Sequence, residues 1–201
     1  MIEQLKFIEE INKSCKSFFL ESTFFLHLSK ANRFELKGNN ISKALNNYKN
    51  YGSEVSVLKW FDEYWVYLEI RFEDKNSFIT ISIFQGDASD NKKNQLFRAE
   101  WDDYNNPNEK HPQPHWHITS NQAIENTFTE LIEEDEEEGF AAIILNEEKS
   151  KIIDINKIHF PMNGNWMNDD GHIHLINDNA KMIKWFQGFF STMREQLEYV
   201  K

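Results

Sequence analysis

The sequence predicts an α+β protein, in which an antiparallel meander sheet is flanked by an N-terminal and a C-terminal helix. Apolar residues recur at spacings of three and four near both ends of the chain, which is typical of amphipathic helices. Between residues 64 and 102 the chain instead alternates with period two, and the spacers between the runs are too short for the helical crossovers of a parallel sheet. With 201 residues and no repeat or flexible linker, we expect a single domain over residues 1–201.

The first 60 residues are expected to hold a helix, a strand, a second helix and the start of another strand. The helix over residues 2–20 would have an apolar stripe of Ile2, Leu5, Ile8, Ile11, Cys15, Phe18 and Phe19. Because Cys15 lies on this stripe, we expect a buried small hydrophobe rather than a nucleophile. Residues 24–28 suit a strand, and residues 55–57 begin another. Residues 39–50 predict a short polar helix that carries on one side Ile41, Leu45 and Tyr48.

Three alternating runs form the predicted meander, at residues 64–72, 77–86 and 96–102. In each run one face is apolar and can cover a core. The opposite face of the third run carries Arg98, Glu100 and Asp102. This strand therefore offers one cation and two carboxylates on a single face.

After the meander we expect one return to the sheet and then further elements. Pro112 and Pro114 restrict the backbone to extended conformations, so residues 115–119 are predicted as a strand at the sheet edge. Ser120 or Asn121 would cap the next helix. The remaining predictions are that helix to residue 134, extended segments at 140–145 and 151–160, a short strand at 172–176 and a final helix at 179–199 capped by Asp178.

The charge of the chain limits its partners. Lys plus Arg is 22 and Asp plus Glu is 33, which gives a net charge of −11. This charge opposes non-specific attraction to nucleic acid or to anionic membranes, so nucleic acid is expected only at a local site. The acidic run at residues 133–138 is either a solvated surface, a docking segment for a basic protein partner or a mimic of a nucleic-acid backbone.

No apolar run approaches the roughly 20 residues of a membrane helix. The N-terminal residues lack the apolar region of a signal peptide, and a single cysteine excludes an internal disulfide framework. These features predict a cytoplasmic protein without a membrane partner.

Six of the seven histidines lie in the second half of the chain: His111, His115, His117, His159, His172 and His174. Four of them form two His-x-His pairs, at residues 115–117 and 172–174. On a strand, residues two apart point to the same face, so each pair can aim both imidazoles at one spot. Such a pair suits a divalent metal such as zinc, and it equally suits general acid–base chemistry near neutral pH.

A structural interpretation stands beside this one. The histidines can be polar fillers, with His159 a core residue, while Arg98, Glu100 and Asp102 can form cross-strand ion pairs. Trp101, Trp116 and Trp166 fit a core better than base-stacking platforms. The sequence contains none of HExxH, CxxC, a Walker loop, GxGxxG or GxSxG.

The segment RAEWD at residues 98–102, followed by HPQPHWH at residues 111–117, resembles small bacterial toxin proteins of the TumE type. The resemblance covers about 20 residues, and this chain has added helices at both ends and a second histidine segment. It implies an active cluster of Arg98, Asp102, His111, His115 and His117. It also implies a role in a toxin–antitoxin or phage-defence system that acts on RNA.

The leading hypothesis is therefore a phosphodiester-cleaving, RNase-like effector of such a system. Arg98 would hold an anionic group, and His115 and His117 would exchange protons or bind a metal. Asp102 or Glu100 would orient the imidazoles. The alternative is a non-catalytic subunit of a bacterial defence complex, which binds a protein partner through its acidic run and aromatic surface.

Overall fold

The computed structural model describes residues 3–48, 51–73, 76–90, 93–104, 106, 113–118 and 175–200. Within these ranges it confirms the predicted α+β class, because an eight-stranded antiparallel sheet carries one helix from each end of the chain. The predicted helix at 120–134 and the extended segments at 140–145 and 151–160 lie outside the described residues. None of the described helices has the length and apolar character that a bilayer crossing requires.

The elements in chain order are α1 (Gln4–Cys15), a 3-10 turn (Lys16–Phe18), β1 (Phe25–Lys30), β2 (Arg33–Lys37), β3 (Ile41–Tyr48), β4 (Tyr51–Phe61), β5 (Tyr64–Phe72), β6 (Ser77–Gln85), β7 (Asn94–Asp102), β8 (His115–Ile118) and α4 (Asn179–Tyr199). The first helix is thus shorter than the predicted range of 2–20, and the last has the predicted bounds. Asp178 caps α4 as expected, since its Oδ1 accepts from the backbone N–H of Lys181. Leu175 and Ile176, the described end of the predicted strand at 172–176, are not in a strand.

The meander predicted for residues 64–102 is confirmed. Strands β5, β6 and β7 pair in sequence order, and β8 adds to β7 at the far side. The main path through the sheet is β1-β2-β5-β6-β7-β8. The other edge of β5 is shared, because β2 pairs with its second half and β4 with its first half.

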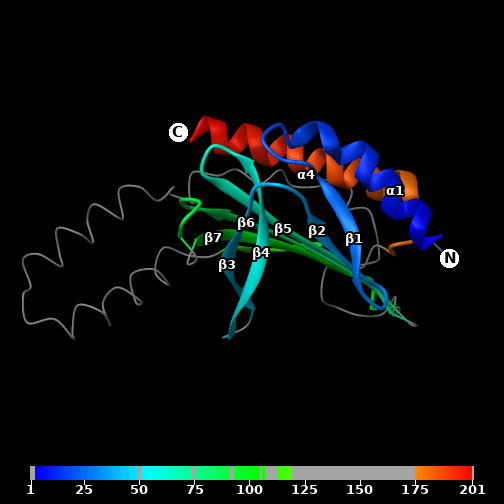
Figure 1. The fold of residues 1–201 in the computed structure, drawn as a ribbon. Coiled ribbons are helices and arrows are strands. Elements are labelled where there is room, and N and C mark those ends of the chain that lie inside the picture. The colour runs from blue at the N-terminus through cyan, green and yellow to red at the C-terminus, as the bar shows by residue number, and fades with distance from the viewer. Residues whose placement is uncertain are drawn as a thin grey trace, which may run out of the picture.

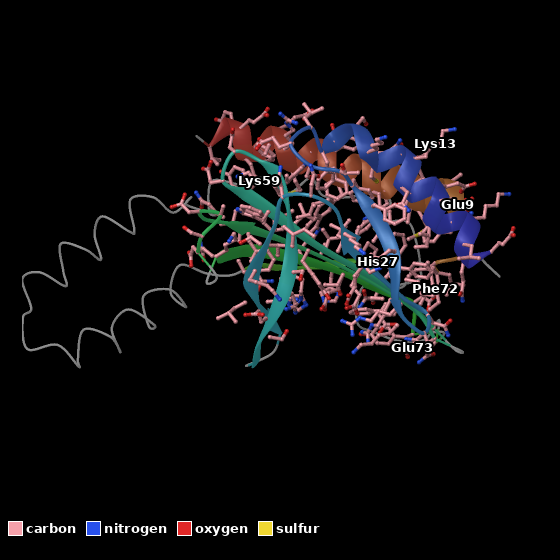
Figure 2. All side chains as sticks on the ribbon, in the orientation of Figure 1. Glu9, Lys13, His27, Lys59, Phe72 and Glu73 are labelled. Carbon is pink, nitrogen blue, oxygen red and sulfur yellow. The ribbon has the colours of Figure 1, made fainter. Side chains whose placement is uncertain are left out.

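Both helices lie on the same face of the sheet and run in the same direction along it (Figure 1). Asn179 at the start of α4 donates to Glu10 of α1, and Phe190 of α4 packs against Phe18 in the turn after α1. Glu9 and Lys13 of α1 face away from the sheet (Figure 2), whereas Asn12 hydrogen-bonds to the backbone of Leu26 on β1. We call the sheet face beneath the helices the helix face.

The main core lies between the helix face and the two helices. The sheet contributes the predicted apolar set of each meander run, including Val66, Leu68, Ile79, Ile81, Phe97 and Trp101. Helix α4 contributes the stripe predicted from its spacing, and Phe186, Phe189 and Phe190 are all buried as expected. Cys15 is also buried in this core, which confirms its structural role on α1. Burial raises the pKa of its thiol to about 12.

The short helix predicted for residues 39–50 is wrong, because residues 41–48 form strand β3. Ile41 and Leu45 have helical spacing, but both are exposed, so their spacing does not mark a buried stripe. The buried positions are instead alternate ones, Ala44 and Asn46, which is the period of a strand. Pairing with β4 along the whole length of β3 overrides the local helical pattern.

Strand β3 also packs against the opposite face of the sheet, which we call the polar face. There Asn46 Oδ1 accepts hydrogen bonds from Ser82 Oγ on β6 at 3.0 Å and from Gln95 Nε2 on β7 at 2.9 Å. A second buried cluster continues this packing and consists of Ala44, Val57, Trp65, Tyr67 and Phe84. Beyond this cluster the polar face carries the charged side chains of the meander.

Candidate functional site

The register of β7 and β8 brings the first His-x-His pair to the charged strand. His117 lies opposite Arg98, and His115 lies opposite Glu100. Opposite residues of an antiparallel pair share a face, so all four side chains lie on the polar face. The edge strand predicted for residues 115–119 is therefore confirmed over His115–Ile118, and it returns beside the strand that bears Arg98.

Three side-chain atoms of this group converge. Glu100 Oε2 lies 3.1 Å from His117 Nε2 and 3.5 Å from His115 Nε2. The two Nε2 atoms are 2.7 Å apart. We call Glu100, His115 and His117 the His–Glu triangle, and their geometry is that of a group able to hold a metal ion.

Arg98 contacts the His–Glu triangle through the carboxylate of Glu100. Its Nε lies 2.9 Å from Oε1 of Glu100, and both side chains are buried. The two carboxylate oxygens of Glu100 thus have different partners, since Oε1 pairs with the guanidinium and Oε2 faces the imidazoles. Arg98 therefore fixes the orientation in which Glu100 presents Oε2.

The triangle opens toward solvent at one corner. The Glu100 side chain is 8 % exposed and that of His115 is 13 % exposed, whereas that of His117 is 45 % exposed. The triangle therefore meets solvent on the side of His117. The carboxylate at the base of the site stays shielded, which strengthens its interactions with charged groups.

Asp102, which was predicted as a member of the cluster, does not join the triangle. Pairing of β8 with β7 ends at the level of Glu100, so no residue of β8 lies opposite Asp102. Its Oδ1 instead accepts from Asn76 Nδ2 at 2.9 Å and from the backbone N–H of Tyr104 at 2.8 Å. Asp102 therefore shapes the turn after β7, and Glu100 is the carboxylate that contacts the imidazoles.

The structure does not describe the other predicted histidines. His111, His159, His172 and His174 lie outside the described residues, as do Trp166 and the acidic run at 133–138. Trp101 is buried in the core as predicted, whereas Trp116 on β8 is 38 % exposed. Of the described histidines, His27 on β1 is not part of the triangle.

A second buried carboxylate, Glu69 on β5, lies on the same polar face. It pairs with Arg33, with Arg71 Nε at 2.9 Å and with the hydroxyl of Tyr67, which donates to Oε2 at 2.5 Å. Burial, followed by the negative charge of Glu69, raises the pKa of Tyr67. The alternation of residues 64–72 places Tyr67, Glu69 and Arg71 on one face, and this is the signal in the sequence that points to the group.

A shallow pocket beside this second group is lined by Lys30, Arg33, Arg71 and Glu73, among others. Its cations do not form a basic patch. Arg33 pairs with Glu35 at 2.8 Å, and Arg71 lies 3.7 Å from Glu73. This pocket therefore offers a phosphate little net positive charge.

Comparison with known proteins found no family model, curated protein or solved structure that matches the chain. The TumE-type resemblance of residues 98–102 and 111–117 stays a prediction. The geometry of the His–Glu triangle is consequently the main support for a function.

Proposed function

We propose that the chain is a hydrolase whose active site is the His–Glu triangle together with Arg98, and that its substrate class is the phosphodiester. The observation that carries the proposal is the convergence of Glu100 Oε2, His115 Nε2 and His117 Nε2 within 3.5 Å of one another at a site open on one side. A convergence of imidazole and carboxylate groups at a partly open position is the arrangement that proton transfer or metal-assisted hydrolysis requires.

Each residue has a role that follows from its place. The lone pairs of His115 and His117 act at the reacting centre, either on a proton or on a metal ion. Glu100 orients the imidazoles through Oε2. Arg98 is a positioning residue, because its Nε lies against Oε1 of Glu100 rather than at the exposed corner.

The local charge of the site favours an anionic substrate despite the net charge of −11. Arg98 and Glu100 neutralise each other, so protonation of an imidazole or binding of a cation makes the site positive. A phosphodiester approaching His117 would then meet a local positive potential. The TumE-type resemblance further suggests RNA, cleaved by an effector of a toxin–antitoxin or phage-defence system in the bacterial cytoplasm.

A hydrolysis assay on the purified chain tests this proposal. Single-stranded RNA, single-stranded DNA and a small phosphodiester with a chromogenic leaving group are the three substrates. We expect cleavage by the wild type and a loss of at least about 100-fold in the His115→Ala/His117→Ala double variant. His27→Ala is the matched control, because this histidine lies outside the triangle. Retention of full activity by the double variant, or no cleavage of any substrate, would contradict the proposal.

A second candidate function is a non-catalytic, protein-binding subunit of a bacterial defence complex. Trp116 and Ile118 favour it, because these apolar residues on β8 are 38 % and 50 % exposed. They point to the opposite face from the two imidazoles, so the two functions can be tested separately on one strand. If binding is the function, Ile118→Ser should abolish the cellular effect of the protein, and the double histidine variant should leave it unchanged.

A further inference from the structure

Hydrogen bonds alone do not account for the three close contacts within the His–Glu triangle. His117 Nε2 faces both His115 Nε2 at 2.7 Å and Glu100 Oε2 at 3.1 Å. An imidazole nitrogen carries in its ring plane either one hydrogen or one lone pair, so it can form one strong hydrogen bond in that direction. One proton placed between two of the atoms therefore leaves the third contact unexplained.

A single cation accounts for all three contacts together, because it accepts a lone pair from every atom. We propose that Glu100, His115 and His117 form a zinc-binding site. In a tetrahedral zinc site with ligands at about 2.0–2.1 Å, two ligand atoms are about 3.3 Å apart. The three separations of the triangle, 2.7, 3.1 and 3.5 Å, lie on both sides of that value.

The ligand set agrees with the chemistry of zinc. Two imidazoles and one carboxylate are a set that catalytic zinc sites use, and it leaves the fourth position for water or substrate. The exposed corner at His117 provides access to such a position. The alternating spacing of a strand supplies the two histidines without any change of backbone direction.

Arg98 strengthens the assignment as a residue outside the ligand set. Groups that hold the second atom of a zinc ligand orient it and tune its basicity. Arg98 occupies Oε1 of Glu100 at 2.9 Å, so Oε2 is left as the oxygen that binds the ion through one bond. The positive charge of the buried guanidinium also offsets the cost of burying the Glu100 carboxylate.

This inference rests on the proposed function only for its catalytic meaning. Zinc at the triangle would occupy the Nε2 lone pairs, so the two histidines would serve as ligands and not as proton carriers. The ion would then supply the positive charge and the activated water of the hydrolysis. Zinc binding itself does not depend on which substrate the protein cleaves.

The experiment is a metal titration of the full chain after removal of metal with a chelator. Zinc affinity is measured by competition with a chromophoric chelator, and cobalt(II) is added separately because its visible absorption reports a tetrahedral site. We expect one high-affinity ion that depends on the triangle, with affinity at least about 100-fold weaker in His115→Ala and in His117→Ala. Glu100→Gln keeps the size of the side chain and should also weaken binding. His27→Ala and Glu35→Gln, on the same sheet, should leave zinc affinity unchanged.

Thermal unfolding of each variant keeps the result interpretable if a substitution loosens the fold. Zinc should raise the unfolding temperature of the wild type and of His27→Ala, but not that of Glu100→Gln. No zinc binding by the wild type, or equal binding by the wild type and the three triangle variants, would overturn the inference. Zinc binding without hydrolysis would support it and contradict the proposed function. Full hydrolysis by a chain that binds no zinc would contradict the zinc site and support the proposed function.

Discussion

Glu69 and Glu100 lie in the same row of the sheet, one on each side of Thr80. Both carboxylates are buried, and each pairs with at least one arginine. They differ in their remaining partners, which are a second arginine and a tyrosine at Glu69 but two imidazoles at Glu100. The polar face therefore carries one carboxylate surrounded by permanent cations and one that faces groups able to bind a metal.

Substitution of these two carboxylates should separate stability from chemistry. In Glu69→Gln the anionic acceptor of Arg33, Arg71 and Tyr67 is lost, and buried ion pairs are costly to break. Because both arginines are about one-third exposed and can be hydrated, we expect a loss of about 2–3 kcal/mol in the free energy of unfolding. Urea denaturation measures this loss.

Zinc affinity and hydrolysis should be unchanged in folded Glu69→Gln, whereas Glu100→Gln should weaken zinc binding and lose hydrolysis. The two variants make the same chemical change in the same row of the sheet, so each is the control for the other. Equal loss of zinc affinity in both would mean that the polar face acts as one electrostatic unit.

Phe189 and Phe190 form a second pair of variants. Each is buried on α4, so replacement by Ala should cost about 3–5 kcal/mol of stability. Phe189 stacks on Trp116 of β8, with ring centroids 5.4 Å apart and planes at 9°. Phe190 instead packs on Phe24 and Trp60.

We therefore expect Phe189→Ala to weaken zinc binding about 10-fold as well, because it removes support from the strand that holds both histidines. Phe190→Ala should reduce stability with little change in zinc affinity. Chemical denaturation and zinc titration on both variants measure the two effects. A larger loss of affinity in Phe190→Ala would show that β8 does not depend on its stacking with α4.

Cys15 should be unreactive in the folded protein. Its thiol is buried and has a pKa of about 12, so only about one thiol in 10,000 is ionised at pH 8. A chromogenic disulfide reagent should label the native chain very slowly and the urea-unfolded chain at once. Rapid stoichiometric labelling under native conditions would show that α1 separates readily from the core.

Tyr67 should make the fold sensitive to high pH. Burial and the charge of Glu69 raise its pKa in the folded state above the value of about 10 in the unfolded chain. Above pH 10 the unfolded state thus loses a proton that the folded state keeps, so stability must fall as the pH rises. The contribution of the neutral phenol is fully present below pH 10.

The variant Tyr67→Phe should cost about 1–2 kcal/mol at neutral pH, because the hydrogen bond to Glu69 is lost. Its stability should then decline less steeply than that of the wild type above pH 10. Urea midpoints at several pH values between about 8 and 11 give the two slopes. Parallel slopes would mean that the phenol ionises in both states alike.

Much of the fold was predictable because its patterns are local. The period-two runs of residues 64–102 predicted β5, β6 and β7, and the apolar stripe of residues 179–199 predicted α4 with its bounds. Strand β3 was not predictable in this way. Its apolar residues have helical spacing by chance, and the backbone pairing with β4 that selects a strand leaves no pattern in the residues of β3 alone.

The candidate site was predictable in part for the same reason. Residues two apart on a strand share a face, so the pairing of His115 with His117 followed from spacing alone. The choice of Glu100 over Asp102 did not, because it depends on where β8 begins to pair with β7. The group around Glu69 depends on the pairing of β2 with β5, between which two other strands intervene in the sequence.

The stacking of Trp116 on Phe189 has a consequence for strand alignment. A slip of β8 by one residue would exchange its two faces, so that Trp116 pointed into the polar face and the imidazoles pointed under α4. The stack on Phe189 and the contact of Trp116 with Phe97 at 5.9 Å would be lost in that alignment. An apolar contact on one side of the sheet thus holds the reactive groups of the other side in place, and selects one of two possible alignments of a four-residue strand.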